Sequence, residues 1–108
     1  MSSPALGAGP YQVNISVDPN GNFTYDPSHL RVKRNDQVTF VSVSGNPFEV
    51  AFKDQSPGDK VFLSPGNQTL TISPNAANGI YHYATAIYDA RQGRVFLDSG
   101  CGDIGVEN

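Results

Sequence analysis

The sequence has few of the residues on which disulfides, zinc sites and membrane spans depend. Its one cysteine, Cys101, cannot close a disulfide within the chain, and it cannot form a cysteine-rich zinc site. No apolar run approaches the ~20 residues that a membrane-spanning helix needs. The net charge of -3 and the pI near 5.0 argue against a nucleic-acid-binding domain, which usually carries a basic patch. The composition therefore predicts neither membrane insertion nor nucleic-acid binding.

The motifs of several enzyme classes are missing as well. The glycine patterns of the Walker and Rossmann phosphate-binding loops are absent, and so is the Gly-x-Ser-x-Gly turn of serine hydrolases. The chain has two histidines, His29 and His82, and the spacing gives neither of them an acid that would orient it as a general base. We therefore expect no catalytic residues, no cofactor and no enzymatic activity.

Turn-forming and β-branched residues are plentiful instead. The chain has 11 glycines and 8 prolines, and its ten valines and five isoleucines outnumber its five leucines. A length of 108 residues suits one domain. We expect a single β-sandwich domain over residues 11–108, preceded by a mobile N-terminal segment at residues 1–10. That segment lacks the basic start and the apolar centre of a signal peptide. The compartment stays open: cytoplasmic if Met1 is the native start, secreted if a signal peptide was removed.

Apolar and polar residues alternate with the period of two that is typical of half-buried strands. The clearest case is Tyr11–Val17, which Asn20-Gly21 separates from Phe23–Tyr25 in the manner of a hairpin turn. The other predicted strands are Leu30–Lys33, Gln37–Phe40, Phe48–Lys53, Thr69–Ile72, Ile80–Ala86 and Arg94–Asp98, with a short edge-like segment at Val61–Leu63. No window has a helical stripe, so we interpret Ala84–Gln92 as a strand end and a loop. Seven or eight strands with frequent turns predict an all-β antiparallel sandwich or barrel.

Three segments, taken in order, resemble one protein family. Residues 25–40, YDPSHLRVKRNDQVTF, resemble the pattern F-x-P-x-x-I-x-V-x-x-G-D-x-V-x-F, and residues 46–52, NPFEVAF, resemble x-P-H-x-V-x-F. Residues 79–85, GIYHYAT, and the later GRV at 93–95 resemble G-x-Y-x-F-x-C followed by a loop and G-x-V. Over residues 11–98 the chain resembles the cupredoxins, the blue-copper fold of plastocyanin and its relatives. The resemblance implies a cupredoxin-like Greek-key β-sandwich of 7–8 strands.

The residues that bind copper in that family are replaced here. The resemblance places Phe48 at the first histidine, Thr85 at the cysteine, Tyr88 at or near the second histidine and Arg91 near the axial methionine. A blue-copper centre needs two imidazoles, a thiolate and a weak axial thioether, yet residues 84–94 contain no Cys, His or Met. We therefore expect a cupredoxin-like domain without type 1 copper and without the electron transfer that such copper supports.

Without a metal, other residues must fill the end of the sandwich where copper would lie. Phe48 and Tyr88 can pack there as part of the core. Alternatively, Pro47, Phe48, Ile87, Tyr88 and Arg91 form an apolar patch rimmed by charge, which binds a partner. On that interpretation the protein is a copper-free binding or assembly module. It would recognise a protein partner or a second copy of itself, through this patch or through an open sheet edge.

Two other functions remain open at this point. Cys101 with His82 or His29 would make a small redox or metal-binding protein of a type other than blue copper, although the neighbouring Asp98 and Asp103 disfavour a reactive thiolate. The chain would otherwise be a non-catalytic subunit or domain of a larger enzyme or complex.

Overall fold

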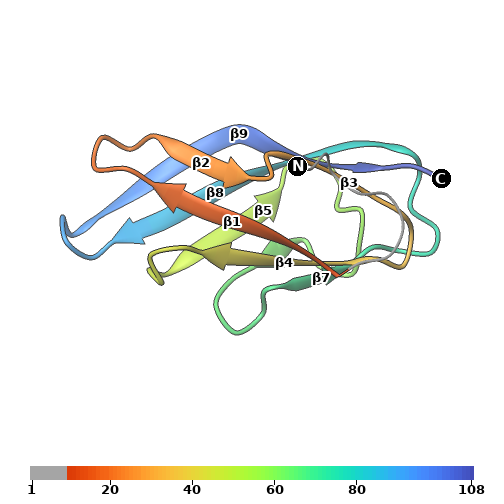
Figure 1. Ribbon diagram of the computed structural model, residues 1–108, viewed down its shortest axis with the longest axis horizontal. Helices are drawn as coiled ribbons and strands as arrows, with labels where there is room; N and C mark the ends of the chain where they lie inside the picture. Colours follow the sequence, from red (N-terminus) through yellow and green to blue (C-terminus); the bar gives the residue numbers. More distant parts are fainter. Residues whose placement is uncertain (1–9) are drawn as a thin grey trace.

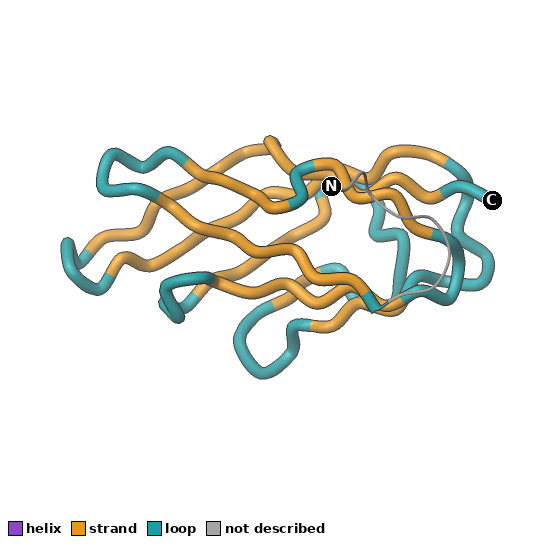
Figure 2. Tube along the Cα trace, viewed as in Figure 1, coloured by secondary structure: helices purple, strands orange, loops and turns teal. Residues whose placement is uncertain are grey.

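The computed structural model describes residues 10–108, except for the side chains of residues 99–101. The predicted N-terminal segment at residues 1–10 therefore lies outside the described part, apart from Pro10. Residues 10–108 form nine strands in two sheets that face each other, and no helix occurs among them (Figures 1 and 2). A helix able to cross a membrane is accordingly not found in this part of the chain. The predicted all-β sandwich is confirmed.

The nine strands are divided between the two sheets. Their bounds are β1 Tyr11–Val17, β2 Phe23–Asp26, β3 His29–Val32, β4 Gln37–Ser42, β5 Phe48–Phe52, β6 Phe62–Leu63, β7 Thr69–Thr71, β8 Gly79–Asp89 and β9 Arg94–Val106. The four-stranded sheet has the order β2-β1-β4-β7, and the five-stranded sheet has the order β3-β9-β8-β5-β6. In Figure 1 the first of these sheets lies in front of β5, β8 and β9.

The two sheets bury the apolar sides of their strands against each other. In β4, for example, buried side chains alternate with more exposed ones, as a period of two predicts. The ring of Tyr83 on β8 lies within this core. Its centroid is 5.2 Å from that of Phe40, 5.6 Å from that of Tyr25 and 5.8 Å from that of Phe52, and each contact is edge to face. Aromatic rings from both sheets therefore meet on one side chain.

The predicted turn between β1 and β2 forms at Asn20-Gly21. Gly21 has a φ of +88°, a conformation that glycine adopts without steric cost. The Asp18 carboxylate accepts hydrogen bonds from the backbone N–H groups of Asn20 and Asn22, both at 2.9 Å. The backbone hydrogen bond from Asn22 is the main cause that lowers the pKa of Asp18. A Cβ at Gly21 would lie 2.9 Å from the ring of Phe96, so this turn packs closely against β9.

Two strand pairs differ from the antiparallel arrangement that the sequence predicts. β1 pairs in parallel with β4, and β3 pairs in parallel with β9. Side chains alternate with the same period in both kinds of pair, so the sequence pattern does not distinguish them. The described residues also contain nine strands rather than seven or eight, because the edge-like segment pairs with β5 at Phe62–Leu63.

The last two strands are longer than the sequence predicts. β8 continues past Ala86 to Asp89, and β9 continues past Asp98 to Val106. The glycine-rich stretch after Asp98 predicts a loop, because glycine shows no alternation and usually weakens a strand. In the structure, a Cβ at Gly102 would overlap with the ring of Tyr83. Glycine is therefore required where β9 passes over this ring.

A polar contact crosses the core beside Tyr83. The hydroxyl of Tyr25 lies 2.6 Å from Oδ2 of Asp98 and 2.9 Å from Oγ1 of Thr85. A phenol carries one proton, so Tyr25 donates to the carboxylate and accepts from the threonine. Burial, and after it the hydrogen bond to Asp98, raises the pKa of Tyr25 well above its usual value. The Tyr83 hydroxyl is also buried, and it has no hydrogen-bond partner in the described part of the chain. Burial, followed by the charges of Asp103 and Asp98, raises its pKa as well.

We expect opposite effects when these two hydroxyls are removed. Tyr83→Phe removes a buried hydroxyl without a partner, so the free energy of unfolding should stay unchanged or rise by about 1 kcal/mol. Tyr25→Phe keeps the ring but deprives Asp98 and Thr85 of a hydrogen bond, so the free energy of unfolding should fall by about 1–3 kcal/mol. Urea denaturation of both variants and the wild type measures the difference. Equal losses in the two variants would contradict this assignment.

Candidate functional site

The five residues of the predicted patch lie where β5 begins and β8 ends. Phe48 and Ile87 are register partners on these strands, and only 7% and 1% of their surfaces are exposed. Pro47 and Arg91 are exposed, and Tyr88 is 41% exposed. The backbone N–H of Tyr88 donates to the Pro47 carbonyl at 2.9 Å. Phe48 and Ile87 therefore belong to the core, and three of the five side chains reach the surface.

A hollow of about 260 Å³ lies at the same end of the sandwich. The connections β1–β2, β4–β5 and β8–β9 meet there (toward the left in Figure 1), and Pro19, Ser44, Asp89 and Arg91 are among the residues that line it. Pro47 and Tyr88 do not line it. The structure thus separates Arg91 from Tyr88, which lies on the outer side of the five-stranded sheet.

The residues at the expected copper position do not fit a copper ion. Phe48 presents a phenyl ring, which has no lone pair, where the resemblance calls for an imidazole. Thr85 presents a hydroxyl in place of a thiolate, and this hydroxyl is hydrogen-bonded to Tyr25. Arg91 carries a guanidinium, which has no acceptor for a cation. Within the described residues, no group of three or more His, Cys, Asp or Glu side chains is arranged to hold a metal. The side chains at this end therefore do not make a type 1 copper centre.

The two histidines lie on either side of Asp103 in the five-stranded sheet. Asp103 is the register partner of His29 on β3 and of His82 on β8. Nδ1 of His29 is 2.7 Å from Oδ2 of Asp103, although 71% of the His29 side chain is exposed. His82 is exposed, as its place in the alternation predicts. Cys101 lies within β9 rather than after the last strand. Its side chain is outside the described residues, so its pairing with a histidine stays a prediction.

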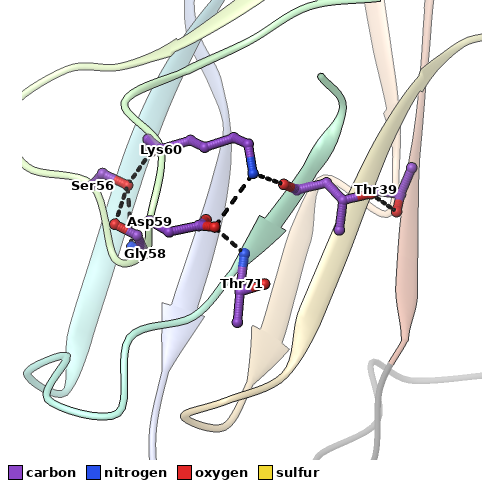
Figure 3. A network of polar contacts seen from close by, with 7 residues as sticks. Thr39, Ser56, Gly58, Asp59, Lys60 and Thr71 are labelled. Carbon is purple, nitrogen blue, oxygen red and sulfur yellow. Dashed lines mark hydrogen bonds and ion pairs between the residues drawn. The ribbon is translucent and has the colours of Figure 1, made fainter. Parts of the chain in front are cut away.

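A segment of the same chain covers the edge of the four-stranded sheet at β7 (Figure 3). The backbone N–H of Asp59 donates to the Thr71 carbonyl at 3.1 Å, and Oδ1 of Asp59 accepts from the Thr71 N–H at 2.9 Å. Nζ of Lys60 donates to the Thr69 carbonyl at 2.7 Å. The hydroxyl of Ser56 donates to the Lys60 carbonyl and so closes the covering loop on itself. These groups occupy both backbone groups of Thr71 and the Thr69 carbonyl, so the covering loop lies where another strand would have to pair with β7.

The outer side of the five-stranded sheet, in contrast, is apolar and exposed. Leu97 is 77% exposed, Ile80 60%, Phe62 57% and Val95 54%. Val95 is the register partner of Tyr88, and Leu97 is the register partner of Ala86. Exposed apolar side chains therefore have apolar or small neighbours on the adjacent strand. We call this surface the outer apolar face; it comprises Ala51, Phe62, Ile80, Ala84, Ala86, Tyr88, Val95 and Leu97. Large apolar side chains exposed together on one side of a sheet are typical of interaction sites.

A hollow of about 330 Å³ lies within the outer apolar face. It is lined by Glu49, Ala51, Ala84, Thr85, Ala86, Leu97 and Asp98. The pairing of β8 with β9 shifts at this place, since Tyr83 pairs with Gly102 and Thr85 with Asp98. Three residues of β9 therefore lie opposite one residue of β8, Ala84, which is a β-bulge. The small alanines and this bulge together make the sheet surface concave beside Leu97.

The sequence does mark this face, but with runs of consecutive apolar residues and not with alternation. The segments VFL at 95–97, VFL at 61–63 and AIY at 86–88 are apolar at consecutive positions. Consecutive apolar residues in a strand are typical of strands that are covered on both sides. In this chain one side of each segment faces the core, and the other side is exposed. These segments thus have the pattern of strands covered on both sides, but in the described residues their outer side is exposed.

Comparisons with known proteins define the fold. No protein-family model and no curated protein sequence matches the chain. Among solved structures it is similar to a pseudoazurin from Sinorhizobium, with 20% identity and a TM-score of 0.55 over 91% of this chain and 73% of that chain. The oxidised plastocyanin of Dryopteris crassirhizoma is 14% identical and a mutant fern plastocyanin 15% identical; each match has a TM-score of 0.43 and covers 89% of this chain and 99% of the other. The chain has the cupredoxin-like fold. The sequence resemblance is what places Phe48 and Thr85 at the copper position of that fold.

We expect that copper does not convert the protein into a blue-copper protein. After incubation with copper(II) and dialysis, the intense visible absorption of a copper–thiolate bond should be absent, because position 85 has no thiolate. Metal analysis and a visible spectrum test this, with a pseudoazurin treated in parallel as the control. One tightly bound copper per chain with an intense visible band would contradict the expectation.

The Asp59 side chain should protect the β7 edge. Asp59→Ala removes the acceptor of the Thr71 N–H, so this amide hydrogen should exchange with solvent about fivefold to tenfold faster, the equivalent of one hydrogen bond of ~1 kcal/mol. Asp59→Asn keeps an acceptor oxygen and serves as the matched control. Hydrogen exchange followed by NMR measures both variants. If exchange at Thr71 is equally slow in Asp59→Ala, another group covers the edge.

Proposed function

We propose that the protein is a copper-free, cupredoxin-like binding module without catalytic activity of its own, and that it binds a protein partner through the outer apolar face. The observation that carries the proposal is the exposure of Leu97, Ile80, Phe62 and Val95 on one side of a single sheet. Burying a large aliphatic or aromatic side chain contributes about 1.5–3 kcal/mol. A partner that covers these side chains would gain several such contributions at once.

The shape of the face supports the same proposal. The hollow of about 330 Å³ beside Leu97 has the size of a pocket that receives one or two projecting side chains. Leu97 lines it from β9, and the backbone of β9 is held by its pairing with β8, so little backbone entropy is lost when this side chain is covered. Glu49 and Asp98 supply two carboxylates to its lining, and a polar contact with the exposed Glu49 can set the orientation of the partner.

The predicted patch at the end of the sandwich relates to this surface through Tyr88. Tyr88 belongs to the outer apolar face, and its backbone N–H donates to the carbonyl of the exposed Pro47. Arg91 is exposed as well, but it lines the separate hollow at the end of the sandwich. Contact of the partner with Tyr88 and Pro47 is therefore part of the proposal, whereas Phe48 and Ile87 act from the core by supporting β5 and β8. A subunit of a larger complex would use the same surface, since it is the exposed apolar part of the described residues.

A charged substitution on the outer apolar face should abolish binding without unfolding the protein. Leu97→Asp replaces an exposed side chain, so stability should change by less than about 0.5 kcal/mol. Val43→Asp is the matched control, because Val43 is 65% exposed but lies in the β4–β5 connection, away from the face. Wild type, Leu97→Asp and Val43→Asp are used as baits in parallel, and the bound proteins are identified by mass spectrometry.

The proposal expects partners that wild type and Val43→Asp retain and Leu97→Asp loses. Hydrogen exchange of the reconstituted complex should then show protection on β5, β8 and β9. An identical set of proteins on all three baits, or protection confined to the four-stranded sheet, would overturn it.

A further inference from the structure

We propose that one partner of the outer apolar face is a second copy of this chain, which forms a symmetric face-to-face dimer. The inference rests on the proposed function, because it names an occupant for the same surface. In a symmetric dimer one surface must be complementary to itself. Three observations support this for the outer apolar face: its central row has alanines on β5 and β8, the charges on either side of Ala51 are of opposite sign, and the side chains along β8 match about Ala84.

The central row runs across the strands and contains Phe62, Ala51 and Ala84. Ala51 is the register partner of Phe62 on β6 and of Ala84 on β8. When a two-fold axis lies along this row, each of these residues meets its own equivalent in the second copy. Facing alanines let two sheets approach to the usual separation of about 10 Å, and facing phenylalanines can stack.

The charged residues on either side of Ala51 select this row as the axis. Glu49 lies two residues before Ala51 and Lys53 two residues after it, and both side chains are exposed on the outer side. Lys53 stays beside β8, since its backbone N–H donates to the His82 carbonyl at 3.1 Å. A two-fold axis at Ala51 reverses the strand direction, so Glu49 of each copy comes opposite Lys53 of the other. An axis through Glu49 itself would place two carboxylates against each other, which is unfavourable.

The same axis matches side chains along β8. Ala86 and His82 lie at equal distances on either side of Ala84, and so do Tyr88 and Ile80. Ala86 of one copy therefore faces His82 of the other, and the hollow that Ala86 lines can receive the imidazole. Tyr88 of one copy faces Ile80 of the other, which pairs two exposed apolar side chains.

The size of the face indicates a weak dimer. From Ile80 to Tyr88 it is about 27 Å long, and from β9 to β6 it is about 14 Å wide, from the usual rise per residue and strand spacing. The footprint is then about 400 Å² per copy, half of the ~800 Å² that a standard stable interface buries on each side. We therefore expect association in the range of about 10 μM to 1 mM, in competition with other partners of the same face.

Sedimentation velocity of the full chain, from about 5 μM to about 1 mM, tests the dimer across this range. Wild type and Val43→Asp should shift from monomer to dimer with concentration. Phe62→Asp should stay monomeric, because it places two carboxylates on the axis. Its circular dichroism spectrum and thermal unfolding are measured alongside, so that loss of the fold is distinguished from loss of the dimer.

A charge exchange tests the register directly. Glu49→Lys alone and Lys53→Glu alone should each weaken association at least fivefold, because each places like charges opposite one another. The double variant Glu49→Lys, Lys53→Glu should restore association to near the wild-type level. Restoration by the double variant would support this arrangement over any dimer formed through another surface.

Three results would overturn the inference: a wild type that stays monomeric at every concentration, a dimer that Phe62→Asp leaves intact, or a double variant no better than the single ones. None of these three results tests whether the outer apolar face binds another protein. If Leu97→Asp still loses a foreign partner that Val43→Asp retains, the outer apolar face is a binding surface for another protein, and the second copy is not its occupant.

Discussion

Three aromatic rings surround the ring of Tyr83, and the backbone of β9 at Gly102 lies directly against it. Two of those rings, Tyr25 and Phe40, come from the four-stranded sheet, and Phe52 comes from the five-stranded one. This contact therefore sets how far apart the sheets lie and which residue of β9 can pass over β8. Protein interiors are packed closely enough that a change at such a point is felt by its neighbours.

The packing inside the sandwich also shapes its outer surface. Gly102 is paired with Tyr83, and Asp98 is paired with Thr85. Three residues of β9 therefore lie opposite Ala84 alone. These residues form a bulge, which interrupts the pairing of β8 with β9 at the place where the hollow lies on the outer side. The cupredoxin-like fold thus carries, in this chain, a core of aliphatic side chains and aromatic rings and a concave apolar face on the outer side of the five-stranded sheet. The fold alone does not specify either feature, because function depends on the residues at the site.

The sequence predicts those parts of the fold that depend on alternation and on turn residues. Tyr11–Val17 and the Asn20-Gly21 turn appear in the structure where they were expected, because local chemistry determines both. The second half of β9 could not be predicted, since its strand character comes from contacts with β3 and Tyr83 and not from its own glycine-rich residues. The candidate surface was missed for a related reason. Alternation identifies the buried side of Val95–Leu97, but only the assembled sheet shows that nothing in the described residues covers the other side.

The parallel pairing of β3 with β9 has a consequence for the order of events during synthesis. In the described part of the chain β9 is the one sheet neighbour of β3, and the paired residues His29 and Asp103 are 74 positions apart. A nascent chain that has left the ribosome as far as β8 therefore holds β3 without its neighbour. The five-stranded sheet closes only when the residues up to Val106 have emerged, so this domain completes its fold late, after nearly all of it has been translated.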